Sequence, residues 1–147
     1  MEERLGRLLA MTGKVAREYF DRDLMAVGSS LNTYVVLRTV AQWPGVSQRQ
    51  LATSLGIEGP TLTHHLDRLA ADGLIERARN PSDRRVSYVE LTPAGRTHLD
   101  RVETHAQMRD KEFRSMFTPE EAATLVSLLN RIRDHFTEEA DVNDAAG

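Results

Sequence analysis

Four arginines gather in a short stretch near the middle of the chain, and a single acid accompanies them. They are Arg77, Arg79, Arg84 and Arg85, and the acid is Asp83. A guanidinium group binds phosphates and base edges, and the negative potential of a narrow minor groove attracts it. A solvated charged turn is the alternative, but so many arginines exceed what solubility requires. We therefore expect DNA contact here, with Arg84 entering a minor groove and Asp83 orienting an arginine by an ion pair.

A second candidate site lies in residues 59–71, where polar and apolar side chains separate at helical spacing. Leu62, Leu66 and Leu69 fall on one face, which we expect to pack on the body of the protein. Thr, His and Arg on the other side can reach base edges and phosphates in a major groove, and an ordinary solvated face is the alternative. The candidate DNA-binding residues here and just upstream are Ser47, Gln48, Pro60, Thr61, Thr63, His64, His65 and Arg68.

Two short helices would position these side chains. Ser47 followed three residues later by Gln50 is a capping box, in which each side chain satisfies a backbone N–H at the start of a helix. This helix covers about 48–55, and Gly56 supplies the left-handed residue that ends it. The second helix covers about 59–71. Two short helices joined by a tight turn that contains glycine make a helix-turn-helix.

Beyond Gly73 the period of the sequence changes from that of helices to that of strands. Residues 74–79 and 85–91 are predicted to be two strands, and Asn-Pro-Ser-Asp at 80–83 is typical of a turn. A β-hairpin directly after a helix-turn-helix is the layout of a winged helix. The sequence therefore predicts a winged helix-turn-helix region over residues 31–92.

Longer helices flank this region on both sides. An amphipathic helix is predicted over 2–26, and another over 31–42 that Ser29 or Ser30 can cap. Thr92-Pro93 is a strong helix start.

The helix that follows Thr92 is predicted to run to about residue 116. A full capping box at 118–121 begins the last helix, which we expect to end at about 138. The tail, 139–147, is expected to be frayed. The fold class is thus mainly α (α+β): a winged helix-turn-helix with long N- and C-terminal helices.

A colinear set of motifs runs through residues 51–95. It consists of Leu51-Ala52, Leu55-Gly56, Leu69, Gly73-Leu74, Asp83-Arg84-Arg85 and Leu91-Thr92-Pro93-Ala94-Gly95. This pattern resembles the MarR family of bacterial regulators, and with the terminal helices the likeness covers nearly the whole chain. The resemblance implies a homodimer on a near-palindromic operator in double-stranded DNA, usually a repressor that a small molecule releases. His64-His65 stands where the family often has an arginine, which leaves the base preference open.

The terminal helices carry more apolar side chains than one winged domain can cover, which predicts a homodimer. We expect a single domain over 1–147 in which 1–28 and 93–138 are dimerisation helices. The expected interface residues are Leu5, Leu8, Leu9, Leu125, Leu128, Leu129, Ile132 and Phe136.

A ligand pocket is expected in the crevice where the first, second and fifth helices meet, because interfaces between substructures are common small-molecule sites. The resemblance points to the same crevice and to aromatic or phenolic ligands. Lining candidates are Tyr19, Tyr34, Arg38 and Met108. Arg38 can pair with a carboxylate. The alternative is that Tyr19 and Met108 are core residues and that Arg38 is an ordinary surface residue.

The composition excludes several kinds of site. There is no cysteine, so disulfides and thiolate catalysis are excluded, and the commonest zinc ligands are missing. His98 and His105 lie seven residues apart on one helix face, but a pair is not a complete metal site. We expect neither a metal nor another cofactor. The net charge of −3 does not argue against DNA, because the distribution of basic residues matters more.

The remaining patterns bear on the class of protein. No apolar run approaches the roughly 20 residues of a membrane span, and the N-terminus lacks the features of a signal peptide, so a soluble cytoplasmic protein is expected. No nucleophile–base motif, phosphate loop or paired carboxylates indicate an enzyme. A winged-helix protein-interaction module without DNA binding is the alternative. The polar row and the arginine-rich hairpin favour a DNA-binding regulator, and activation instead of repression stays open.

Overall fold

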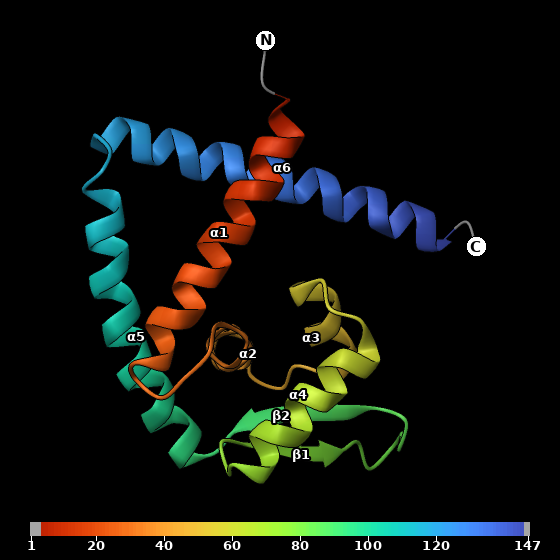
Figure 1. Ribbon diagram of the computed structural model, residues 1–147. Coiled ribbons are helices and arrows are strands. Elements are labelled where there is room, and N and C mark those ends of the chain that lie inside the picture. The colour runs from red at the N-terminus through yellow and green to blue at the C-terminus, as the bar shows by residue number, and fades with distance from the viewer. Residues whose placement is uncertain (1–3, 146–147) are drawn as a thin grey trace. The chain divides into compact units, whose positions relative to one another are not determined.

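The computed structural model describes the backbone of residues 4–145 and the side chains of residues 4–138. The elements follow in the order α1 (Leu5–Met25), α2 (Leu31–Gln42), α3 (Gln48–Leu55), α4 (Gly59–Ala71), β1 (Ile75–Arg79), β2 (Ser87–Leu91), α5 (Pro93–Arg114) and α6 (Pro119–Ala145) (Figure 1). They form two compact units, Met1–Ala106 and Gln107–Gly147. Within the described part, no helix has both the length and the apolar character needed to cross a membrane.

The core of the first unit is built around α2, which Figure 1 shows end-on. Val36, Leu37 and Val40 of α2 are at most 3% exposed. Buried residues of α3, α4, the hairpin and α5 pack in the same cluster, and they are Leu51, Leu62, Leu66, Leu69, Ile75, Val89 and Leu99. Burial of a leucine stabilises the fold by about 2 kcal/mol. The leucine face predicted for α4 is therefore confirmed, and it anchors this helix with its polar side outward.

Side-chain caps begin the helices where the sequence predicts them. Ser47 Oγ accepts from Gln50 N at 3.1 Å, and Gln50 Oε1 accepts from Ser47 N at 3.0 Å. Thr118 and Glu121 form the same reciprocal pair at 3.2 and 2.9 Å. Of the two candidate serines before α2, Ser30 is the cap. Each cap satisfies N–H groups that have no partner within the helix.

The loop of the hairpin is longer than predicted. The strand that we predicted from residue 85 begins at Ser87, and Asn80 N donates to Val86 O at 2.9 Å across the loop. The cause is Asp83, whose Oδ1 accepts from the backbone N of Arg85 at 3.0 Å. An aspartate that bonds the backbone two residues further on favours a turn over a strand.

Several predicted ends of elements were wrong by a few residues. The first strand begins at Ile75 instead of residue 74, and α5 ends at Arg114 instead of 116. The helix that we predicted to end near 138, with a frayed tail after it, is helical to Ala145, because no proline or glycine interrupts it after its first residue. Residues 2 and 3 of the predicted first helix, and 146–147 of the tail, lie outside the described residues.

Candidate nucleic-acid interface

The side of α4 away from its buried leucines is polar and open to solvent. Pro60, Thr61, His64 and Arg68 are exposed, while Thr63 and His65 are partly buried. Such a row is what a recognition helix presents to the major groove. The arrangement follows from the helical period, because the leucines that anchor α4 leave the residues between them outside the core.

Gln48 and Thr63 join α3 to α4. Gln48 Nε2 donates to Thr63 Oγ1 at 2.7 Å, and the Thr63 hydroxyl donates to Gly59 O at 3.0 Å. Between the helices, Gly56 takes a φ of 61°, the left-handed conformation predicted for it. The bond brings two predicted site residues together and fixes the start of α3 beside α4.

The wing, as we call β1, β2 and residues 80–86 between them, carries a second predicted group. Asp83 accepts from the backbone N, Nε and Nη2 of Arg85 at 3.0, 3.2 and 3.4 Å. The Arg85 side-chain bonds, and then its backbone bond, lower the pKa of Asp83 below its ordinary value. As predicted, Asp83 pairs with an arginine. Arg84, the neighbour of both, is exposed and has no ion pair in the described part of the chain.

Arg77 of the wing has a protein partner. Its Nη2 donates to Oδ1 of Asp67 on α4, and the two side chains are 30% and 56% exposed. Arg79 is exposed and makes no ion pair among the described residues. Asp67 was not among the site residues predicted from the sequence. The alternation of side chains along a strand could have indicated this pair. Arg77 lies on the same face of β1 as Ile75, and Ile75 is buried in a core to which α4 also contributes.

The base of the wing is fixed to the start of α5. Thr92 Oγ1 donates to Gly73 O and accepts from Gly95 N at 2.9 Å, while Thr92 N donates to Leu74 O at 3.1 Å. A Cβ on Gly95 would stand 1.9 Å from Leu74 O. Only glycine fits so close an approach of two backbones, which accounts for a Thr and a Gly three residues apart at the end of the wing.

A polar cluster joins α2 to α5. Arg38 Nη1 donates to Glu103 Oε1, Tyr34 OH donates to Glu103 Oε2 at 3.0 Å, and Arg38 Nη1 lies 3.5 Å from Tyr34 OH. Burial, and then the bond to Glu103, raise the pKa of Tyr34. The structure thus brings together two of the four predicted ligand residues, around an internal carboxylate. Tyr19 is 53% exposed, and Met108 belongs to the other compact unit.

His98 and His105 have separate partners. His98 Nε2 lies 3.2 Å from Ser29 Oγ and its Nδ1 lies 3.2 Å from Arg101 Nη2, while His105 Nε2 lies 2.8 Å from Asp23 Oδ2. Burial lowers the pKa of His98, and Arg101 lowers it further. No group of three or more possible metal ligands occurs among the residues that the structure describes. These histidines join α5 to the region around the end of α1.

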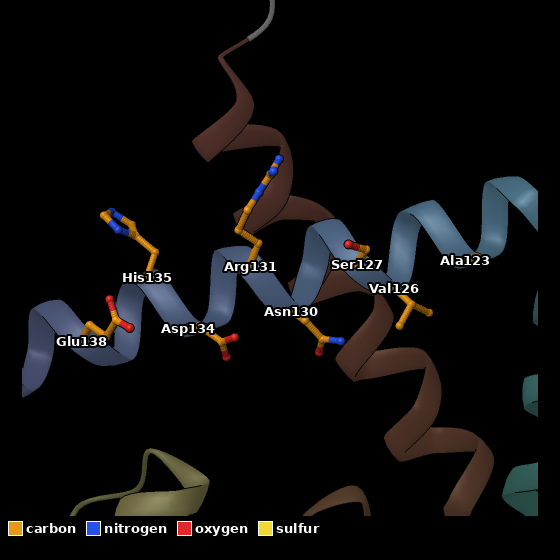
Figure 2. A pocket seen from close by; sticks show the side chains of 8 residues that line it. All are labelled: Ala123, Val126, Ser127, Asn130, Arg131, Asp134, His135 and Glu138. Atoms are coloured by element: carbon orange, nitrogen blue, oxygen red, sulfur yellow. The ribbon is translucent and has the colours of Figure 1, made fainter.

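The last helix has two unlike faces. The predicted interface residues Leu128, Leu129, Ile132 and Phe136 are 36% to 58% exposed, and Leu125 is partly buried. The other side of α6 is mostly polar (Figure 2), and a shallow hollow there is lined by Ala123, Val126, Ser127, Asn130, Arg131, Asp134, His135 and Glu138. In α1, Leu5 and Leu8 are exposed and Leu9 is partly buried. Both terminal helices therefore leave apolar side chains uncovered in the single chain.

Comparison with known proteins gives matches in sequence. The model of the MarR family matches residues 30–87, which span α2 to the start of β2. A transcriptional regulatory protein assigned to the hcr operon of Thauera aromatica is 31% identical over 105 residues, which is 71% of this chain. The chain spans 63% of the length of that relative.

Solved structures match over most of the chain. The transcriptional repressor CouR bound to a 23-mer DNA duplex is 30% identical with a TM-score of 0.83, over 88% of this chain and 92% of that one. A mutant of MarR from E. coli complexed with operator DNA is 28% identical with a TM-score of 0.79, over 87% and 92%. These matches confirm the winged-helix fold and favour a regulator over an enzyme or an interaction module. The chain belongs to the MarR family of transcriptional regulators.

Proposed function

We propose that this chain is a sequence-specific regulator of transcription that binds double-stranded DNA as a homodimer in the cytoplasm. The observation that carries the proposal is the exposed polar row of α4 beside a wing whose Arg84 is exposed and has no ion pair among the described residues. Both features suit adjacent grooves of one duplex. The two solved relatives described above are bound to DNA, which supports the same conclusion.

Helix α4 and the wing would bind adjacent grooves of the duplex. Thr61, His64 and Arg68 would reach base edges and phosphates in the major groove, with Ser47 and Gln48 at the nearby start of α3. The wing would follow the adjacent minor groove through Arg79, Arg84 and Arg85. The negative total charge is no obstacle, since DNA meets only the local basic surface.

The dimer would be held by residues 1–28 and 93–138, while residues 31–92 bind DNA. The support is the apolar stripe of α6, in which Leu128, Leu129, Ile132 and Phe136 are 36% to 58% exposed. Contiguous apolar side chains on a surface mark interaction sites. Two-fold symmetry would place two copies of α4 roughly 34–36 Å apart, one turn of the duplex. The operator would therefore be near-palindromic.

A selection experiment tests this function and identifies the operator at the same time. The full chain is incubated with a random library of duplexes of about 30 base pairs, a length that holds two half-sites, and bound DNA is sequenced after several rounds. We expect enrichment of one two-fold symmetric motif. If the pool stays as random as one carried through without protein, the proposal is wrong.

We also propose that a small aromatic or phenolic effector releases the repressor from DNA. Tyr34 and Arg38 already hold a carboxylate, that of Glu103, and these two side chains would take the carboxylate of an aromatic acid in its place. An effector lowers operator affinity only by its preference for the DNA-incompetent state.

Titration with salicylate tests the effector site, with thermal stability and binding to the selected duplex as readouts. We expect a rise in melting temperature and a loss of DNA binding, both abolished by Arg38→Ala. No response of the wild-type chain at millimolar salicylate, or an equal response of the variant, would remove these residues from the assignment.

A further inference from the structure

We infer that Asp67 and Arg77 form a brace that sets the position of the wing relative to α4. Asp67 would then be a positioning residue for DNA binding, and Arg77 would act through Asp67 instead of on DNA. The inference rests on the proposed DNA-binding function. It departs from the prediction that Arg77 itself contacts DNA.

The brace complements two other attachments of the wing. At its base, Thr92 bonds to the backbone of Gly73 and Leu74. Along its β2 edge, Val89 N donates to Val46 O at 3.1 Å. Neither contact touches the outer part of β1. The Asp67–Arg77 pair connects that part of β1 directly to the helix that carries the polar row.

The direction of Arg77 follows from the register of the hairpin. Residues 75, 77 and 79 share one face of β1, and Ile75 is 2% exposed in the core. Arg77 pairs with Val89 across the strands, and Val89 is fully buried. The guanidinium therefore leaves β1 on the side that faces the core, where Asp67 meets it. The bond joins residues ten apart in the sequence, so it fixes the angle between two elements.

The negative charge of Asp67 allows the sign of the change in DNA affinity to test the inference. A carboxylate on the surface that meets DNA repels phosphates, so its neutralisation should strengthen binding if Asp67 were only a nearby charge. The brace predicts the opposite sign. Without Asp67 the wing must be ordered when DNA binds, and that ordering lowers affinity.

The folding contribution of the pair is expected to be small. Asp67 is 56% exposed, and exposed ion pairs add little to stability. The melting temperature of Asp67→Asn should therefore stay close to that of the wild type. This separates positioning from a structural role, because only DNA affinity and wing position should change.

The test is a double-mutant cycle on the duplex chosen by the selection experiment. Asp67→Asn and Arg77→Ala are each expected to weaken binding by about tenfold, and the double variant should be no weaker than Arg77→Ala, because coupled residues do not add. Asp67→Glu keeps the charge and the acceptor, so it should retain most of the affinity. Glu76→Gln also removes one negative charge, from the residue that precedes Arg77 in β1, and this change should not weaken binding.

A second measurement reports on the wing without DNA. Because the chain has no cysteine, spin labels can be attached through Thr53→Cys in α3 and Ser82→Cys in the wing, with labelled chain diluted in unlabelled chain. The distance distribution between the labels should be narrow in the wild type and broader in Asp67→Asn.

Two results would overturn the inference. One is an Asp67→Asn variant that binds DNA as well as or better than the wild type, or whose effect simply adds to that of Arg77→Ala. The other is an unchanged label distribution in Asp67→Asn. Failure of the wild type to select any DNA would instead refute the proposed function, and the label distances would still test the brace.

Discussion

The arginines of the wing differ in whether an aspartate of the protein already pairs with them. Arg77 is paired with Asp67 and Arg85 with Asp83, whereas Arg84 has no ion pair among the described residues. A paired guanidinium has already committed some of its five N–H donors to an acid, whereas an unpaired one has all of them for DNA. Residues of one type in one motif can therefore have different roles.

We expect Arg84→Ala to weaken binding to the selected duplex by about tenfold, because a guanidinium is removed from a narrow and negative groove. This should be the largest loss among the wing residues that contact DNA directly. The salt dependence of binding should also fall, by about one phosphate contact if Arg84 neutralises one. Titration by fluorescence anisotropy at several salt concentrations measures both. Arg85→Ala is the matched control and should lose less. Equal affinity of Arg84→Ala and wild type at physiological salt would contradict the prediction.

His98 should make stability depend on pH. Its folded-state pKa is lowered by burial and by Arg101, so the unfolded chain binds protons more readily than the folded one. The contribution of His98 is fully present above its ordinary pKa of about 6.5, and it is lost as the pH falls from there toward the folded-state pKa.

Urea unfolding at a series of pH values, followed by circular dichroism, measures this dependence. His98→Gln cannot titrate but can still bond to Ser29 Oγ, so its free energy of unfolding should fall less steeply below about pH 6.5 than that of the wild type. Parallel pH profiles of the two proteins would show that His98 is not responsible.

At the scale of the elements, the junction of the wing with α5 is held by several close contacts. Thr92 caps α5 and at the same time bonds to the residues that lead into β1. Gly95 lets the first turn of α5 press against Leu74. The base of the wing is thus fixed to the start of α5 by backbone contact.

Gly95→Ala should therefore destabilise the chain strongly, by about 3 kcal/mol or more, since its Cβ meets a backbone atom that cannot turn away. Gly13→Ala is a suitable control, because a Cβ there meets nothing within 4 Å and α1 is helical at that point. That change should stabilise by roughly 0.5–1 kcal/mol. Chemical denaturation of both variants measures the difference, and a stable Gly95→Ala protein would contradict the close approach.

At the scale of the whole molecule, the question is what covers the apolar side of α6. Its exposed stripe lies opposite the polar residues of Figure 2. A second copy of the chain would bury the stripe and leave the polar side in water. Dimerisation would also join two DNA-binding regions, so that the second half-site binds at a high effective concentration.

Ile132→Glu should convert the dimer into monomers, because it places a charge in an apolar contact. Affinity for the symmetric duplex should then fall by about a hundredfold or more as the linkage of half-sites is lost. Asn130→Glu adds the same charge on the polar side and should remain dimeric. Light scattering at micromolar concentration gives the masses. A monomeric wild type, or an Ile132→Glu variant that stays dimeric, would refute this arrangement.

Features with a local cause could be predicted from the sequence. The capping boxes at Ser47 and Thr118, the left-handed Gly56 and the leucine face of α4 each depend on residues within about two turns of one another. Asp83 pairs with an arginine two positions away, so this pair could also be predicted from the sequence. The fold class and the general location of the candidate site follow from such local patterns.

The partners of Arg77, Arg38 and Gly95 could not be predicted in the same way. Arg77 and Arg38 both looked available for a ligand, yet Asp67 and Glu103 already occupy them. The fit at Gly95 depends on the backbone of Leu74. These contacts join different elements, and local periodicity does not specify the angle at which two elements meet. That angle comes from the packing of the whole core, so only the tertiary structure shows that Arg77 and Arg38 are already paired with acids of other elements.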